Sequence, residues 1–503
     1  MGTLQQKAVK GITWSTAATI VNAVMQIGYT SIMARLLDPK AFGLVATSQL
    51  IIRFAVYFSE MGLGKALIQK EKLEDSDVRA AFTGTALLGV FFFVATLVAA
   101  PHIYRQFLDD EALVDVIKFM SLNFVVTGLV GTSLNLLRRR LEFQTLSIIE
   151  ISTYIFSYAV VGVGLAMQGF GVYALLSATL TQSILTGIIA YALVRHSVAP
   201  IFKWTAYKGL LAYGSRMSLI SFLEFISNNM DTFIIGRQLG ARALGFYNRA
   251  WMLIFLPIIN LSTSVSRVLF PTLSSIQSDI ERLRRVYLDT IKFVAFGVVP
   301  ICAGVAVASE EAVLTLLGPR WTASIPLLQL IALVAPVKIL MTFGGIICDA
   351  TDRLQTKMKL ELVYIIFLAT ALLFVFRDYG VIGVAIMVLI AEIFKNIAYA
   401  FVLKRILGYS IYKDVVLGYV PAAAAGVLVG GGIYLVRLLM PATFIAEVPL
   451  AALGIDAVVG GAMLIVGLII PTGAPIRHIV WQRFLGKSKL ASKPILVRLF
   501  MPQ

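Results

Sequence analysis

Long apolar stretches recur along the whole chain and are separated by short polar segments. A helix of about 20 apolar residues is long enough to cross the hydrocarbon core of a membrane. The pattern predicts fourteen membrane-spanning helices, near residues 11–34, 42–62, 80–100, 114–136, 146–167, 171–194, 214–236, 247–268, 290–309, 322–347, 360–376, 380–402, 416–439 and 448–470. The expected fold class is therefore an all-α polytopic membrane protein.

One stretch of this pattern occurs twice. "IMARLLDPKAFGLVA" (32–46) aligns without a gap on "IIGRQLGARALGFYN" (234–248), 202 residues later. Four identities carry the alignment: Arg35 with Arg237, Leu37 with Leu239, Ala41 with Ala243 and Gly43 with Gly245. Each stretch joins the first and second spans of a six-span set. The repeat therefore predicts two six-helix bundles of the same orientation, an arrangement that transporters use.

The repeat also sets the expected domain organisation. The predicted parts are an N-terminal six-helix lobe (1–205), a C-terminal six-helix lobe (206–410), an additional helix pair (411–475) and a basic cytoplasmic tail (476–503). The two lobes are expected to be pseudo-symmetric, and the last two spans have no counterpart in the repeat.

Composition agrees with a membrane protein. Hydrophobic residues make up 59% of the chain and charged residues 14%, whereas soluble domains carry about 25% charged residues. The net charge of +16 does not indicate nucleic-acid binding. Lys and Arg are about three times as numerous in the loops on the side of the membrane that holds both termini as in the loops on the other side. This bias predicts cytoplasmic termini, with attraction to anionic membrane lipids as a by-product.

Two polar stripes follow the repeat. In the first span, four polar residues at steps of three, four and three share one helix face: Thr19, Asn22, Gln26 and Tyr29. Their counterparts 202 residues later are Ser221, Glu224, Asn228 and Asp231. Such stripes form interhelical hydrogen bonds or line a hydrated cavity, and the two acids favour a cavity. Glu60, Glu224 and Asp231 are the candidates for binding a coupling ion.

Charged residues also lie inside predicted spans. Lys338 sits near the middle of the span at 322–347, where a lysine costs about 2.5–3.5 kcal/mol on insertion scales. No acidic residue lies near it on its own helix, and Pro336 precedes it, so we expect it to face a water-filled interior. Arg53 lies seven residues before Glu60.

Glu392 and Lys395 form a further charged pair. They are three residues apart, which favours a couple that neutralises itself on one helix face.

No motif of catalysis is present. The sequence lacks a phosphate-binding Gly-x-x-x-x-Gly-Lys-Ser/Thr loop and a Gly-x-Ser-x-Gly elbow, and its three histidines are isolated. The loops between predicted spans are too short for a catalytic domain. The sequence therefore predicts a protein that is not an enzyme and that holds no cofactor and no metal.

Four stretches resemble a known family. They are "ARLLDPKAFGLVA" (34–46), "LGFYNRAWMLIFLP" (244–257), "LFPTLSSIQSDIERLRRVYL" (269–288) and "LLGPRWTASIPLLQLIAL" (316–333). All four are similar to the polysaccharide transporter family, the Wzx-like flippases of the multidrug/oligosaccharidyl-lipid/polysaccharide superfamily. The likeness is closest to lipopolysaccharide biosynthesis proteins of the colanic-acid-exporter type and extends over roughly residues 1–410.

The resemblance implies a protein of the bacterial inner membrane with two lobes around a central cationic cavity. Such flippases carry undecaprenyl-diphosphate-linked oligosaccharides to the outer leaflet by alternating access, for exopolysaccharide, capsule or O-antigen synthesis. The expected protein is a monomer that works beside polymerase and chain-length proteins. The residues that this sequence offers for a cationic cavity are Arg53, Lys338, Arg249 and Lys395.

Three alternatives remain open at this point. A cation-coupled multidrug extruder of the same superfamily would use the acids Glu60, Glu224 and Asp231, although Arg53 and Lys338 would repel a cationic drug. A lipid II flippase is chemically close to the favoured function. A membrane scaffold for polymer assembly would leave the repeated polar stripes unexplained.

Overall fold

The computed structural model describes residues 2–59, 63, 67–68, 70, 73–107, 110–202, 204–351, 353–408, 412–470 and 473–480. Regular structure within these residues is helical, without strands. The chain divides into two compact units, Met1–Asn248 and Arg249–Gln503. This division falls later than the lobe boundary expected after residue 205. That boundary stays a prediction, because a sequence repeat and spatial compactness divide a chain by different criteria.

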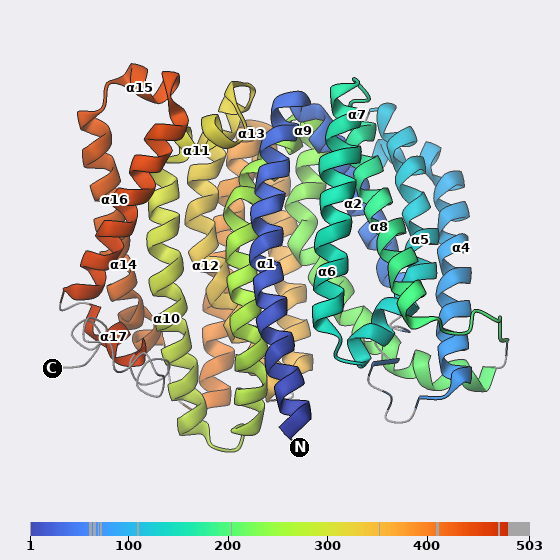
Figure 1. Cartoon of the computed structure of the whole chain (residues 1–503). Coiled ribbons are helices and arrows are strands. Elements are labelled where there is room, and N and C mark those ends of the chain that lie inside the picture. The colour runs from blue at the N-terminus through green and yellow to red at the C-terminus, as the bar shows by residue number, and fades with distance from the viewer. Residues whose placement is uncertain are drawn as a thin grey trace. The chain divides into compact units, whose positions relative to one another are not determined.

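The first unit is built from α1 (Gly2–Leu36), α2 (Pro39–Ser59), α4 (Asp75–Phe107), α5 (Ala112–Arg139), α6 (Phe143–Tyr154), η1 (Ile155–Gly162), α7 (Val163–Met167), α8 (Val172–Val194) and the part of α9 (Trp204–Ser275) up to Asn248. Its long helices run side by side (Figure 1). The π-helical segment η1 continues α6 into α7, so these three elements form one span. Buried apolar side chains hold α5 against α4 and α8.

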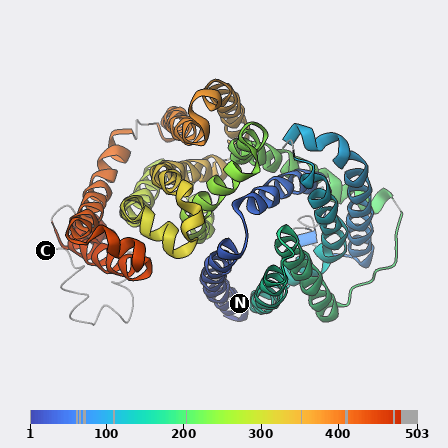
Figure 2. The same cartoon turned by 90° about the horizontal axis from the view of Figure 1, so that it is seen from above.

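The second unit contains the rest of α9, α10 (Ile280–Val307), α11 (Ser309–Leu316), η2 (Pro319–Ser324), α12 (Ile325–Ala350), α13 (Leu354–Leu407), α14 (Tyr412–Leu439), α15 (Ala442–Glu447), α16 (Pro449–Ile469) and α17 (Ala474–Val480). Helix α10 packs on α12 and on α14, and α14 packs on α16. Figure 2 shows α14 and α16 next to each other, at the red end of the colour scale. The additional helix pair is therefore joined to this unit through α10.

Two glycines divide the longest helices. Gly240 in α9 has φ 85° and Gly380 in α13 has φ 57°, in the left-handed region that residues with a side chain rarely adopt. Each of these helices therefore consists of two segments that meet at the glycine. The break at Gly240 falls between the spans predicted at 214–236 and 247–268, and the break at Gly380 falls on the first residue of the span predicted at 380–402.

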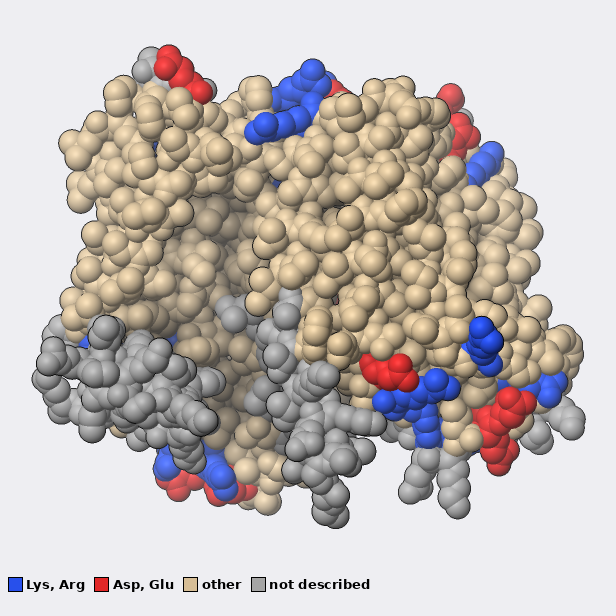
Figure 3. Space-filling model, viewed as in Figure 1, with Lys and Arg blue, Asp and Glu red and all other residues tan. Residues whose placement is uncertain are grey.

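Within the described residues, the fourteen predicted spans fall mainly on helices. By length and composition, nine helical segments of the described residues qualify as membrane spans, from Asp75–His102 to Pro449–Ile469. On the face shown in Figure 3, the described charged side chains lie towards the ends of the helices, and the band between them is formed by other residues. The chain is a multi-pass membrane protein of the all-α class, as predicted.

The two copies of the repeated stretch contact each other inside the first unit. A Cβ atom on Gly43 would lie 1.7 Å from the carbonyl oxygen of Ala241, and one on Gly245 would lie 2.0 Å from that of Pro39. In the repeat, position 39 corresponds to 241 and position 43 to 245. The two close approaches are therefore equivalent when the copies are exchanged, so the repeat has local two-fold symmetry at this crossing. Only glycine allows backbones to approach so closely.

This crossing makes a stability prediction. Gly43→Ala or Gly245→Ala places a methyl group within the backbone of the opposite copy, and such overpacking costs about 1–3 kcal/mol. We expect each variant to melt at a lower temperature than the wild type in detergent. Gly131→Ala is the matched control, because a Cβ atom there meets nothing within 4 Å. Unchanged melting of both crossing variants would contradict the requirement for glycine.

Candidate functional site

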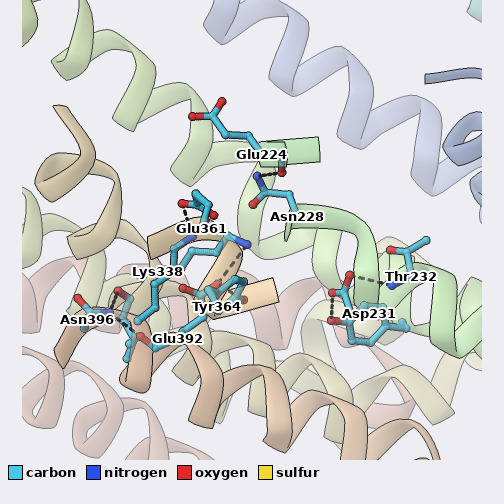
Figure 4. A network of polar contacts seen from close by, with 12 residues as sticks. Glu224, Asn228, Asp231, Thr232, Lys338, Glu361, Tyr364, Glu392 and Asn396 are labelled. Atoms are coloured by element: carbon cyan, nitrogen blue, oxygen red, sulfur yellow. Dashed lines mark hydrogen bonds and ion pairs between the residues drawn. The ribbon is translucent and has the colours of Figure 1, made fainter. Parts of the chain in front are cut away.

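Four charged side chains in the second unit form two ion pairs between helices (Figure 4). The Lys338 Nζ atom lies 3.4 Å from Oε1 of Glu392, and the Lys395 Nζ atom lies 2.8 Å from Oε1 of Glu361. The Tyr364 hydroxyl donates a hydrogen bond of 3.0 Å to the same Oε1 of Glu392. Two lysines and two glutamates give a network with no net formal charge.

Helix periodicity and the break at Gly380 explain how these residues meet. Glu361 and Tyr364 are three residues apart on the first segment of α13 and share a face. Glu392 and Lys395 share a face of the second segment in the same way. The pair between Glu361 and Lys395 therefore joins the two segments of α13, and the pair with Lys338 joins α13 to α12.

A further hydrogen bond ties α13 to α12 beside the lysine. The Asn396 side chain donates a bond of 3.0 Å to the carbonyl oxygen of Val337, the residue next to Lys338. Its Nδ2 atom also donates to the carbonyl oxygen of Glu392, at 2.8 Å. The amide thus positions the backbone on which Lys338 stands.

Aromatic rings complete the surroundings of the lysines. The Lys338 Nζ atom lies 5.1 Å from the ring centre of Trp251 and 5.9 Å from that of Phe255, and these two rings are stacked. The Lys395 Nζ atom lies 4.3 Å from the ring centre of Tyr364. An ammonium group over an aromatic face gains about 0.5–2 kcal/mol, more where water is excluded. Each lysine is thus held by a carboxylate and by at least one ring.

The two lysines differ in their accessibility. The side chain of Lys338 is 23% exposed and its carboxylate contact is 3.4 Å long, whereas that of Lys395 is 12% exposed with a contact of 2.8 Å. Lys338 is therefore the more accessible of the two cations. The roles of both lysines in cargo binding stay predictions.

One expectation about this region needs correction. In place of a Glu392–Lys395 couple on one helix face, the structure pairs Glu392 with Lys338 and Lys395 with Glu361. The acidic partner of Lys338 thus lies on another helix, and the expectation that this lysine faces a water-filled interior stays a prediction. Pairing between packed helices satisfies all four charges at once.

Asp231 occupies a buried position in the first unit, with 6% of its surface exposed. The Tyr247 hydroxyl donates a 2.6 Å hydrogen bond to its Oδ2 atom, and the Thr232 amide donates one of 2.7 Å to its Oδ1 atom. Tyr247 lies beyond the break at Gly240, so this contact joins the two segments of α9. The role of Asp231 in a polar stripe that lines a cavity stays a prediction.

The rest of the polar stripes is more accessible. Asn228 is exposed and donates to the carbonyl oxygen of Glu224, one turn earlier on the helix, while Glu224 itself is half-buried. Asn22 and Gln26 are half-buried on α1, and the Oδ1 atom of Asn22 is buried without a hydrogen-bond partner among the described residues. The side chain of Ser221 lies outside the described residues.

Three site candidates remain, namely Arg53, Arg249 and Glu60. Arg53 is exposed on α2. Arg249 is half-buried on α9, where its guanidinium group contacts the sulfur of Met252 at 3.3 Å. Glu60 lies outside the described residues. The roles of all three in cargo or ion binding stay predictions.

Sequence reasoning missed several members of the network. Glu361, Tyr364, Asn396 and Trp251 were not singled out, although an acid three residues before a tyrosine inside an apolar helix is a usable signal. Within the described residues, no group of three or more His, Cys, Asp or Glu side chains is placed to hold a metal ion.

Known proteins are similar to this sequence over most of its length. A family model described as "Polysaccharide biosynthesis protein" matches residues 32–326, which is more than half of the chain. The chain belongs to this polysaccharide biosynthesis protein family. The resemblance seen in the four quoted stretches is thereby confirmed.

Individual relatives of this family member are about one quarter identical to it. A membrane protein in the cps region of Klebsiella pneumoniae is 26% identical over 474 residues, covering 93% of this chain and 96% of the relative. The lipopolysaccharide biosynthesis protein WzxC of Escherichia coli (strain K12) is 26% identical and covers 82% and 84%. The teichuronic acid biosynthesis protein TuaB of Bacillus subtilis (strain 168) is 25% identical and covers 70% and 73%.

Solved structures show the same fold at lower identity. The lipid II flippase MurJ superimposes with a TM-score of 0.72 at 16% identity, covering 90% of this chain and 97% of that chain. An inward-facing multidrug resistance MATE transporter gives a TM-score of 0.59 at 14% identity, covering 79% and 99%. This polysaccharide biosynthesis protein therefore has the fold of the multidrug/oligosaccharidyl-lipid/polysaccharide superfamily.

The ion pair between Lys395 and Glu361 makes a second stability prediction. Lys395→Met leaves a buried carboxylate without its cation, and breaking such a pair costs about 3–5 kcal/mol. The double variant Lys395→Met with Glu361→Gln removes both charges, so we expect it to recover most of the lost melting temperature. The exposed Lys404→Met is the control. If Lys395→Met alone melts like the wild type, the pair does not stabilise the fold.

Proposed function

We propose that this protein is a flippase that moves oligosaccharide units linked to undecaprenyl diphosphate across the bacterial inner membrane for exopolysaccharide, capsule or O-antigen synthesis. One observation carries the proposal: in a family of polysaccharide biosynthesis proteins, this chain holds an accessible lysine, Lys338, inside an apolar helix. A diphosphate carries about two negative charges and is costly to dehydrate, so its passage needs a cation at membrane depth.

The network gives Lys338 a way to bind and release such an anion. Without cargo, Glu392 and the rings of Trp251 and Phe255 stabilise the ammonium group. An arriving diphosphate takes the place of Glu392, whose Oε1 atom keeps the hydrogen bond from Tyr364. Because Lys338 presents a point charge on a flexible chain, it can follow the cargo over changing distances. Return of Glu392 then favours release.

Arg53 on α2 is proposed as a second phosphate ligand, because its planar guanidinium group suits phosphate oxygens and its side chain is exposed. Alternating access of the two six-helix lobes supplies the movement, and the glycine crossing of the repeated stretches is where they pivot. Both termini lie in the cytoplasm in this proposal. The protein acts as a monomer beside a polymerase and chain-length proteins.

The family match decides between this function and the alternatives. The sequence argument that Lys338 repels a cationic drug loses force, because Glu392 and Glu361 balance the two lysines. Support for a saccharide cargo comes instead from the relatives that are named for lipopolysaccharide and teichuronic acid biosynthesis.

The flippase proposal is tested on Lys338. In a deletion strain, we expect Lys338→Ala to abolish export, so that lipid-linked repeat units accumulate on the cytoplasmic face of the membrane. Lys338→Arg should retain part of the activity, because the positive charge is kept. Lys359→Ala removes a lysine that is exposed near the start of α13 and should export normally. Normal export by Lys338→Ala would overturn the role of this lysine.

Glu392 separates anion exchange from a structural role of the pair. Glu392→Gln removes the competitor of the diphosphate and retains an acceptor for Tyr364. We expect this variant to bind a polyprenyl diphosphate in detergent at least as tightly as the wild type, whereas Lys338→Ala binds at least tenfold more weakly. Equal weakening by both variants would mean that the ion pair itself, not the free lysine, makes the site.

Ion coupling is proposed for Glu224 and Asp231, and the two variants are expected to behave differently. Because Asp231 is buried and accepts from Tyr247, Asp231→Asn should lower the melting temperature, with a cost of about 1–3 kcal/mol. Glu224→Gln should melt like the wild type and slow export in cells. Flipping at the normal rate by Glu224→Gln would remove the coupling role.

A further inference from the structure

A second cluster of charges joins α11 to the additional helix pair, apart from the network around Lys338. Arg437, near the end of α14, contacts three oxygen acceptors with its guanidinium group. It donates a 2.9 Å hydrogen bond to the Val307 carbonyl oxygen, pairs with Glu310, and lies 3.2 Å from Oε1 of Glu311. Arg437 thus forms ion pairs with both acids of α11.

Asp456 on α16 brings a third carboxylate to this place. Its surface is 3% exposed and that of Glu311 is 1% exposed. The Oδ2 atom of Asp456 and the Oε2 atom of Glu311 are both buried, and neither has a hydrogen-bond partner among the described residues. A buried carboxylate oxygen without a hydrogen-bond donor destabilises the fold, so two such oxygens indicate a missing ligand.

A cavity of about 350 Å³ reaches this cluster. Its walls come from α10, α11, α14 and α16, and Asp456 is the single charged residue among apolar ones such as Ile301, Val429 and Leu453. The cavity therefore offers a path to Asp456 but no further ligand for a metal ion. Apolar walls also increase the cost of leaving this carboxylate ionised.

We propose that Glu311 and Asp456 bind one proton between them. The proton comes from water and forms an O–H bond on one of the two orphan oxygens, which then donates to the other. A single proton thus gives both buried oxygens a partner. It also reduces three negative charges facing one arginine to two. The site is a proton-binding site of the helix pair and does not depend on the identity of the cargo.

Three charged residues act on Glu311: Glu310 from α11 itself, Arg437 from α14 and Asp456 from α16. Burial raises the pKa of Glu311 above its ordinary value of 4.5. A backbone hydrogen bond and Arg437 lower this pKa, whereas the carboxylates of Asp456 and Glu310 raise it. The net direction is upward, towards retention of a proton.

The proton decides how α16 packs on α11. With it, the two carboxyl groups attract each other through a hydrogen bond. Without it, like charges repel across the junction, because Arg437 is already shared with Glu310. Loss of the proton is therefore expected to loosen the additional helix pair from α11. In the proposed topology this junction lies on the side of the membrane opposite the termini.

Infrared difference spectroscopy of the purified protein tests the site directly. We expect the wild type near neutral pH to show the carbonyl band of a protonated carboxylic acid, with the shift that exchange into D₂O produces. Glu311→Gln and Asp456→Asn should each lose this band, and the exposed Glu447→Gln should keep it. A wild type without the band, or a band unchanged in both variants, would refute the proposal. Replacing choline by sodium at constant ionic strength should leave the band unchanged, whereas its loss would assign the site to sodium instead.

The pH dependence of the melting temperature provides a second test, which is made first on the wild type. Because the pKa of Glu311 is raised in the folded protein, the native state binds the proton more tightly than the unfolded chain. The resulting stability is fully present below pH 4.5 and is lost as the pH rises through the raised pKa. We expect the melting temperature to fall over this window and Glu311→Gln to show a smaller fall. A melting temperature that rises over the window would contradict the shared proton. None of these readouts measures export, so they can fail independently of the flippase role.

Discussion

A charge inside an apolar helix must be neutralised or hydrated, and the second unit follows this constraint. Lys338 and Lys395 would each be costly alone in the hydrocarbon region. Their pairing with Glu392 and Glu361 makes α12 and both segments of α13 depend on one another. The packing of these helices and the chemistry of the site therefore rest on the same four side chains, because moving one helix would leave a charge without its partner.

Unequal pairing is the reason why Lys338, and not Lys395, is the proposed binding site. Lys395 is held tightly and deeply, whereas Lys338 keeps a longer contact and a larger exposed fraction. A cation that is fully satisfied cannot bind a new anion without loss, and one that is unsatisfied cannot stay in the membrane. The intermediate position of Lys338, with a carboxylate on one side and aromatic rings on the other, meets both conditions.

The three acids around Arg437 follow the same constraint, but there the excess charge is negative. There the carboxylates outnumber the cations, and the two orphan oxygens of Glu311 and Asp456 are buried. A lysine network with equal charges needs no proton, whereas an acidic excess does. The proposed anion site and the proposed proton site thus differ in the balance of charges around them.

Periodicity and composition alone were sufficient for the all-α class, the multi-pass membrane topology and the repeat of 32–46 at 234–248. These properties depend on the order of residues along one helix, which a single sequence contains in full. The sequence also contains Gly43 and Gly245 as aligned positions. Their contact with the opposite backbone, however, is visible only when both copies are placed in space.

Pairing between helices was decided by tertiary structure. Glu392 lies three residues from Lys395, which favours an intrahelical couple, yet packing of α12 brings Lys338 closer to Glu392 and leaves Lys395 to Glu361. In the same way Asp231 belongs to a polar stripe by its spacing but is buried against Tyr247 after the break at Gly240. Spacing along a helix determines which face a side chain occupies. The side chains that this face contacts come from residues far away in the chain. Only the folded protein brings those residues together.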